Sequence, residues 1–352
     1  MKIRPKNHIV PALIVAAAAF MAVMAVARPA ATAESVLSAM TLSVRSVVPS
    51  LFAFVAAIGI LSPALAVLMS KMKGAMRLFR VGAGGLVMIA AGLLSGFPMA
   101  AVTYSEMSRL GAIDESEGES LMPYCSGASA AFLIGSVGGG MYGDAALGAR
   151  LFVCQTVAAI VLISASRKRR TPTSTAVILK EKITLAHAAR AIADAGATML
   201  GITATIVFFT VFADATASVI RLPDVIDGVL RGALEISGGL AALSRFGDAG
   251  RYLSGYVVGF SGISVFMQCH RASRGAAMKK YLGGKIIMSS LTGTLFVLTE
   301  IFRPAPAFFE IFGSRATEAE NTARAVLIFV FIASVCALFC AFVFRKATKA
   351  RK

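Results

Sequence analysis

The sequence predicts an all-α polytopic membrane protein, built as an inverted repeat with two re-entrant hairpins and two broken transmembrane helices. Of the 352 residues, 57% are hydrophobic and only 15% are charged, which is well below the charged share typical of a soluble domain. Several apolar runs reach the roughly 18–20 residues that cross a bilayer. Four Ser-Gly steps lie near the centres of such runs, two in each half of the chain. Together these observations indicate spans that are interrupted at defined points.

The basic residues favour a lipid environment over a nucleic-acid partner. The formal net charge is +17, and in a soluble protein such a charge would suggest nucleic acid. Here the lysines and arginines cluster at the ends and in the loops between apolar runs, as the positive-inside rule describes. We therefore expect a multi-pass integral membrane protein with both termini in the cytoplasm and no nucleic acid as partner.

Neither a metal site, nor a cofactor, nor an enzymatic site is predicted. The cysteines follow no ligand spacing and are expected to act as small hydrophobic residues: Cys125, Cys154, Cys269, Cys336 and Cys340. The three histidines lie far apart in the sequence, and the spans contain no paired Asp or His residues.

The first half divides into an N-terminal helix and one repeat. Residues 1–40 hold an apolar run at 9–26, expected as a retained helix with a linker, and the alternative is a signal peptide cleaved near Ala31-Thr32-Ala33. The first gate-type repeat, 41–170, contains four segments: a span at 44–69, a hairpin at 84–108, a broken span at 119–140 and a span at 143–166.

The hairpin is predicted from Ser95-Gly96-Phe97-Pro98, at the centre of its apolar run. Gly weakens a helix and Pro removes a backbone donor, and in hydrocarbon such a break persists only inside protein or beside water. The basic loops at 71–80 and 167–190 should both be cytoplasmic, so the three segments between them must cross an even number of times. One of them has to turn back, and this segment is the best candidate.

The second half repeats the order of the first in the opposite orientation. A basic cytoplasmic linker, 171–190, precedes the second repeat, 191–302, and residues 303–352 hold a last span at 323–344 and a basic tail. The second repeat comprises a span at 191–213, a hairpin at 223–247 broken at Ser237-Gly238, a span at 252–270 broken at Ser261-Gly262 and a span at 281–300. Close helix packing through small residues is the simpler alternative for these Ser-Gly steps.

The chain resembles the YlbJ family of sporulation integral membrane proteins, within a wider group that carries a nucleoside-recognition or gate domain. The resemblance covers most of residues 40–300 and lies in these stretches: Val48-Pro49-Ser50-Leu51-Phe52, Leu94 to Pro98, the acidic loop 110–121, Cys125-Ser126-Gly127, Gly138 to Gly143, Leu234-Glu235-Ile236 and Phe260 to Val265. It implies a fold like that of concentrative nucleoside transporters. It also implies movement of dipicolinic acid across the outer forespore membrane during endospore formation.

The breaks suggest an anion site near the midplane. Each break leaves a half-helix N-terminus, whose free N–H groups and dipole favour an anion, so four of them could hold a small dicarboxylate without a buried lysine or arginine. We expect serines at the breaks to cap these ends or to donate to the ligand. The predicted substrate-binding residues are Ser95, Gly96, Phe97, Pro98, Ser126, Gly127, Ser129, Glu235, Ser237, Gly238, Ser261, Gly262, Ser264 and Gln268.

Glu235 has two interpretations. A carboxylate near mid-bilayer costs about 2.5–3.5 kcal/mol on insertion scales and is a functional candidate. It could couple transport to a proton or a sodium ion, or bind substrate hydroxyls or a ring nitrogen. Alternatively it pairs with Arg231, one turn earlier.

Three functions remain open from the sequence. The first is transport of a small organic anion, and the second is transport of a nucleoside or another small neutral solute, which Glu235 would suit. The third is a membrane scaffold without transport. The sequence does not decide whether the chain forms a homo-oligomer.

Overall fold

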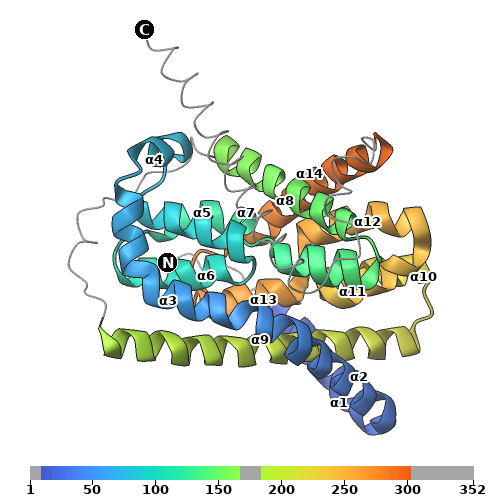
Figure 1. Cartoon of the computed structure of the whole chain (residues 1–352). Coiled ribbons are helices and arrows are strands. Elements are labelled where there is room, and N and C mark those ends of the chain that lie inside the picture. Colours follow the sequence, from blue (N-terminus) through green and yellow to red (C-terminus); the bar gives the residue numbers. More distant parts are fainter. Residues whose placement is uncertain (1–8, 167–183, 303–352) are drawn as a thin grey trace, which may run out of the picture.

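The computed structural model describes residues 9–166 and 184–302, and every regular element within these two ranges is helical. The first range holds α1 (Ile9–Ala27), α2 (Pro29–Leu42), η1 (Ser43–Val47), α3 (Val48–Ser70), α4 (Lys73–Phe79), α5 (Ala83–Ser95), α6 (Met99–Arg109), α7 (Glu115–Cys125), η2 (Ala131–Met141) and α8 (Ala145–Ala165). The second holds α9 (Leu185–Val219), α10 (Asp224–Leu234), α11 (Ile236–Leu243), η5 (Ser244–Phe246), α12 (Gly247–Phe260), α13 (Gly262–Ala272) and α14 (Tyr281–Ile301). The all-helical prediction is confirmed for these residues (Figure 1).

Several of these helices are long and apolar enough to cross a membrane. Four qualify by length and composition: Leu51–Ser70, Ala145–Ala165, Leu185–Val219 and Tyr281–Ile301. Two bent pairs bring the number to six if each is one span: Ile14–Ala27 with Pro29–Arg45, bent by 114°, and Lys73–Phe79 with Ala83–Ser95, bent by 80°. The described chain therefore has the helical pattern of a multi-pass membrane protein.

The first hairpin turns at Gly96-Phe97-Pro98, where the sequence predicts the break. Gly96 has φ +75° and ψ −168°, a conformation that only glycine adopts readily, and the Phe97–Pro98 peptide is cis. The two arms pack against each other, because a Cβ on Gly92 of α5 would lie 3.1 Å from the Cβ of Ala100 of α6. Each arm is shorter than the roughly 20 residues of a spanning helix.

The second hairpin turns two residues earlier than predicted. Helix α10 ends at Leu234, Glu235 is extended with φ −144° and ψ 122°, and α11 begins at Ile236. Ser237 and Gly238, the predicted break, lie in the first turn of α11. The side chain of Glu235 accepts a hydrogen bond from the Gly238 N–H, so a carboxylate rather than a Ser-Gly step begins the second arm.

Two longer helices are interrupted where the sequence predicts. Helix α7 ends at Cys125, and residues 126–129 separate it from the π-helix η2. Helix α12 ends at Phe260 and α13 starts at Gly262, with Ser261 between them in the left-handed region at φ +71°. Each break interrupts the helical ladder of backbone hydrogen bonds at a buried position.

The remaining elements differ from the predicted ones in length and position. Helix α9 runs over 35 residues and not only 191–213, and the expected linker after residue 26 is largely the helix α2. The last predicted span, 323–344, the basic tail and most of the basic linker lie outside the described residues.

The body formed by the described helices has two opposite ends, and most of its salt bridges lie at these ends. At one end, Lys279 contacts Glu115 at the start of α7 at 3.3 Å, and this hydrogen bond raises the pKa of Lys279. At the other end, Arg150 of α8 contacts Glu300 of α14 at 2.7 Å. In Figure 1 the first end, with α4 and the start of α9, lies at the left, and α10 lies at the right.

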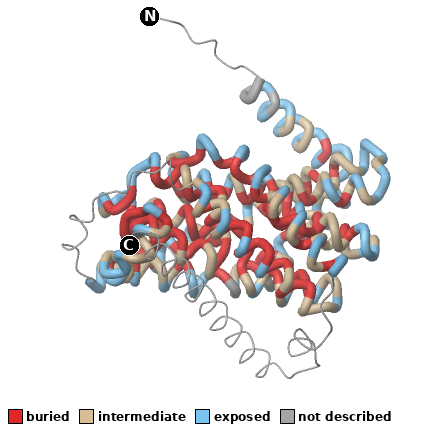
Figure 2. The backbone as a smooth tube through the Cα atoms, turned by 90° about the horizontal axis from the view of Figure 1, so that it is seen from above, coloured by how far each residue is buried: buried red, intermediate tan, exposed pale blue. Residues whose placement is uncertain are grey.

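The hairpins and broken helices form the buried centre of the molecule. Figure 2 shows buried residues throughout the body, whereas α1 extends away from it and is mostly exposed. Exposed apolar side chains such as Val26 and Leu200 also mark helix faces that no other described residue covers, as expected for surfaces that contact lipid.

Candidate substrate-binding site

The tip of the first hairpin lies directly on the break between α7 and η2. The Phe97 N–H donates to the carbonyl of Gly127 at 2.7 Å. A Cβ added to Gly96 would clash with the backbone nitrogen of Ser129, well inside 3.0 Å. Only a glycine at the tip permits this approach, so the two interruptions of the first half form one contact.

The second hairpin contacts the second break in a similar way. A Cβ added to Gly262, at the start of α13, would lie 3.2 Å from the carbonyl oxygens of Gly232 and Leu234 and 3.3 Å from the Ile236 nitrogen. Gly262 has φ +86°. The end of α10 and the start of α11 therefore pack against the break between α12 and α13.

Lys285 of α14 connects the two broken helices to each other. Its ammonium donates to the Ser126 carbonyl at 2.5 Å and to the Ser261 hydroxyl at 2.9 Å. The thiol of Cys269, on α13, lies 3.6 Å from the Ser126 hydroxyl. Breaks that are 135 residues apart in the chain thus share one buried hydrogen-bonded centre.

Three of the four breaks line a small inner cavity of about 30 Å³, and α13, which follows the fourth break, adds Gln268. Five of the predicted site residues line it: Phe97, Ser129, Glu235, Ser237 and Gln268. Apolar side chains complete the wall, namely Val47, Leu51, Phe132, Ile202 and Ile206. The cavity combines a few polar groups with a mainly apolar lining, which is the usual character of a small-molecule site.

Glu235 is buried at the cavity and forms no ion pair with an arginine of the described residues. Its carboxylate caps α11 through the Gly238 N–H at 2.8 Å, and the residue is 3% exposed. The predicted alternative, a pair with Arg231, is wrong, because Arg231 instead bridges Asp227 at 2.6 Å and Asp214 of α9. The arginine ties α10 to α9 and leaves the Glu235 carboxylate facing the cavity.

Two polar side chains on α13 are buried without a hydrogen-bond partner among the described residues. These atoms are the Ser264 hydroxyl and the Gln268 Oε1 oxygen. A buried polar atom without a partner costs free energy, so such groups point to a missing ligand or water. Gln268 lines the cavity, which makes its amide the best placed of the two to bind a solute.

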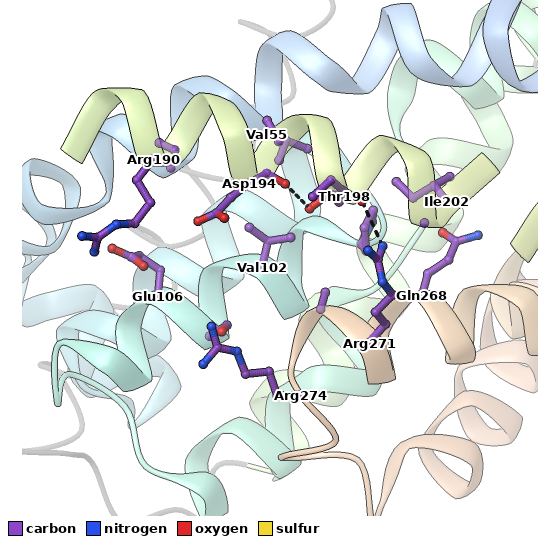
Figure 3. A pocket seen from close by; sticks show the side chains of 18 of the residues that line it. Val55, Val102, Glu106, Arg190, Asp194, Thr198, Ile202, Gln268, Arg271 and Arg274 are labelled. Carbon is purple, nitrogen blue, oxygen red and sulfur yellow. Dashed lines mark hydrogen bonds between the residues drawn. The ribbon is translucent and has the colours of Figure 1, made fainter. Parts of the chain in front are cut away.

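A larger vestibule of about 600 Å³ lies next to the inner cavity. Ile202 and Gln268 line both and so form the wall between them. Figure 3 shows the vestibule between α9 and α6, with the end of α13 on one side. Four arginines and two carboxylates supply its charge: Arg109, Arg190, Arg271, Arg274, Glu106 and Asp194.

The other predicted residues build the walls of the site or lie behind them. Pro98 lines the vestibule, whereas Ser95, Gly96, Gly127 and Gly238 line neither cavity. The same is true of Ser126, Ser261, Gly262 and Ser264.

The expected capping by serines holds at only one break. Ser129 accepts from the Phe132 N–H at 3.2 Å. The Ser126 hydroxyl donates back to Met122 and the Ser261 hydroxyl back to Val258. These two serines close the end of the preceding helix rather than the start of the next one.

Lys285 is the principal residue that sequence reasoning missed. No role was expected for this lysine, and the structure buries it fully between the breaks. Its position in the apolar run 281–300 was a usable indication, since an ionisable residue inside a span is a functional candidate by default.

Comparisons of the chain with protein-family models, curated proteins and solved structures found no match. Function is therefore inferred from the geometry of the breaks and of the two cavities.

Proposed function

We propose that the chain is a membrane transporter of a small organic anion, which binds between the hairpin tips and the broken helices. The observation that supports this most directly is that interrupted helices from both halves meet, both at the Lys285 centre and around one inner cavity with polar groups in its wall. Broken helices that meet near the bilayer midplane form the substrate sites of many secondary transporters.

The order of the elements supports an inverted repeat related to the concentrative nucleoside transporters. Each half has a long helix, a hairpin, a broken helix and another long helix: α3, α5–α6, α7–η2 and α8, then α9, α10–α11, α12–α13 and α14. The first hairpin opens toward the end that holds α4, and the second opens toward the opposite end (Figure 1). Two such halves would give alternating access by moving against each other.

The charges of the vestibule favour an anion. Its arginines outnumber its carboxylates, and a cleft with excess positive charge raises the local concentration of anionic solutes. By the positive-inside rule this basic end faces the cytoplasm, as do both termini. The helix N-termini at the breaks would then hold a carboxylate inside the membrane.

The two cavities suggest different stages of the path. A volume of about 600 Å³ lies in the range of small-molecule sites, whereas about 30 Å³ matches the share of one water molecule. The substrate would therefore enter the vestibule first, and the inner cavity would widen as a hairpin moves.

Dipicolinic acid during endospore formation is the substrate that the resemblance to the YlbJ family implies. It is a small aromatic dicarboxylate, and Phe97 and Phe132 lie at the cavity with ring centroids 6.5 Å apart.

A nucleoside or another small neutral solute is the second candidate. Glu235 and the free oxygen of Gln268 favour it, because both accept hydrogen bonds from hydroxyl or amide groups. A membrane scaffold without transport is the third, and it requires no solute at all.

Flux into liposomes that contain the purified chain separates the three. We expect saturable uptake of labelled dipicolinate, lost in the double variant Ser129→Ala plus Gln268→Ala and kept in the control Ser290→Ala, whose exposed hydroxyl bonds only to its own helix. Uptake of uridine with no effect of dipicolinate would favour the nucleoside function. Absence of flux for both solutes, in protein that is folded, would favour the scaffold.

A further inference from the structure

The centre between the two broken helices holds the amine of Lys285, which pairs with no carboxylate of the described residues. Lys285 is 0% exposed, and no salt bridge to it is present among the described residues. Its neighbours are hydroxyl, thiol and carbonyl groups, with the ring of Tyr281 at 5.8 Å. A buried ammonium is costly unless other groups replace its water.

Helix termini supply that replacement. Ser126 is the C-terminal cap of α7 and Ser261 that of α12, and Lys285 donates to both residues. The C-terminal end of a helix carries a partial negative charge and free carbonyl groups, so it stabilises a cation. The ammonium thus lies where two helix ends of this kind meet.

Close packing of α14 fixes the ammonium at this position. A Cβ on Gly284, next to Lys285, would lie 2.5 Å from Cγ of Pro123 in α7. On the other side, a Cβ on Gly259 of α12 would lie 2.6 Å from Cα of Ser289 in α14. Helix α14 is therefore held against both broken helices, and the lysine reaches both breaks from one backbone.

In secondary transporters, the carbonyls of unwound segments and the C-terminal ends of half-helices are the groups that coordinate a coupling sodium ion. We propose that the Lys285 ammonium occupies the position of such an ion, so that this chain carries its own fixed cation between the breaks and works without sodium. The transport part of this inference rests on the proposed function, but the cation site itself does not.

The sharpest test is a cation titration of the purified chain and of Lys285→Ala, read as thermal unfolding in detergent. We expect the wild-type midpoint to be the same in NaCl, KCl and choline chloride. In Lys285→Ala the midpoint should be lower in choline chloride, and NaCl or methylammonium chloride should raise it saturably by roughly 2–4 °C. The exposed neighbour Lys280, paired with Glu119, gives the control Lys280→Ala, which should show no response to these cations.

Two outcomes would overturn the proposal. One is a folded Lys285→Ala protein that neither cation stabilises, which would leave Lys285 a purely structural group. The other is a saturable sodium response of the wild-type chain, a measurement that remains decisive even if Lys285→Ala does not fold.

Liposome flux then distinguishes this inference from the proposed function. Dipicolinate uptake by the wild type that requires sodium would contradict the role of Lys285 and leave the transporter function intact. Absence of uptake for every solute would contradict the transporter function, while the thermal titration would still report on the cation site.

Discussion

At the scale of single residues, Gly96 is the site position with the strictest requirement for glycine. Its backbone lies in a region reserved for glycine, and the position of a Cβ is already occupied by the Ser129 backbone. An alanine there would strain the tip and push it away from the break in α7–η2. This one residue therefore sets the distance between the hairpin and the broken helix.

We expect Gly96→Ala to lower the free energy of unfolding by about 1–3 kcal/mol, the usual cost of a strained backbone position. Gly196→Ala is the matched control, because nothing lies within 4 Å of a Cβ there and the residue is inside α9. Thermal unfolding in detergent measures both variants. Equal midpoints for the two would show that the tip does not fit closely against Ser129.

Two substitutions at Glu235 can separate the effect of its charge from its role as the cap of α11. Glu235→Gln keeps an oxygen that can accept from the Gly238 N–H but removes the buried carboxylate, whereas Glu235→Ala also removes the cap, at a cost of about 1 kcal/mol. We expect Glu235→Gln to leave the thermal midpoint nearly unchanged and to reduce flux at least roughly tenfold. Full flux in Glu235→Gln would restrict this residue to capping.

Residue chemistry explains which site residues could be predicted from the sequence. A Gly-Phe-Pro step inside an apolar run has few structural solutions, so Gly96 could be placed correctly. Glu235 could be recognised from the sequence as a functional candidate. Its alternative pairing with Arg231 was wrong, because Arg231 has carboxylates on two other positions, one on α10 and one on α9, within reach. Lys285 acts through residues more than 20 positions away in the chain, and spacing along the sequence does not show such contacts.

At the scale of elements, the second hairpin depends on contact between its arms. A Cβ on Gly239 of α11 would overlap the backbone of Gly232 in α10. The neighbouring Gly238 is different, because a Cβ there would meet only a Glu235 carboxylate oxygen at 3.6 Å. Two adjacent glycines in one turn therefore have opposite tolerance for a side chain.

We expect Gly239→Ala to destabilise the protein by about 1–3 kcal/mol through overpacking of the arms. Gly238→Ala should be neutral or slightly stabilising, because alanine favours a helix. The thermal midpoints of the two variants give the comparison. Similar losses for both would mean that the arms of α10 and α11 do not pack as described.

The ends of the helices were predictable where residues in the immediate sequence cause the break. The interruptions near Gly96, Ser126 and Ser261 follow from residues that weaken helices in apolar runs. The break at Glu235 was placed two residues late, because a Ser-Gly step that packs inside a helix looks the same in sequence as one that ends it. The length of α9 was underestimated because its first turns are polar enough to resemble a loop.

At the scale of the whole molecule, the two cavities share a wall and differ in charge. The vestibule collects arginines from three separate helices or their ends, and the inner cavity adds the carboxylate of Glu235. A solute that crosses from one to the other passes Gln268. The electrostatic field of the vestibule should therefore affect the rate at which an anion associates rather than the transport step itself.

We expect Arg271→Gln plus Arg274→Gln to raise the KM for dipicolinate several-fold at low ionic strength, with less effect at 0.5 M salt because the field is screened. Arg245→Gln, on the 3-10 turn η5 outside the vestibule, is the control and should leave KM unchanged. Liposome flux at two salt concentrations provides the values. A ratio of KM between the double variant and the wild type that is the same at both salt concentrations would exclude electrostatic steering.

The central claim is that interrupted helices from the two halves meet at one buried centre. Its most direct test is a cysteine cross-link between Ser126, at the first break, and the native Cys269 of α13, whose side-chain atoms lie 3.6 Å apart. In a Cys125→Ala background, Ser126→Cys should form a disulfide with Cys269 on mild oxidation, detected by mass spectrometry of the joined peptides. Removal of Cys269 should abolish it. A folded protein in which these positions stay reduced under oxidation would contradict the account.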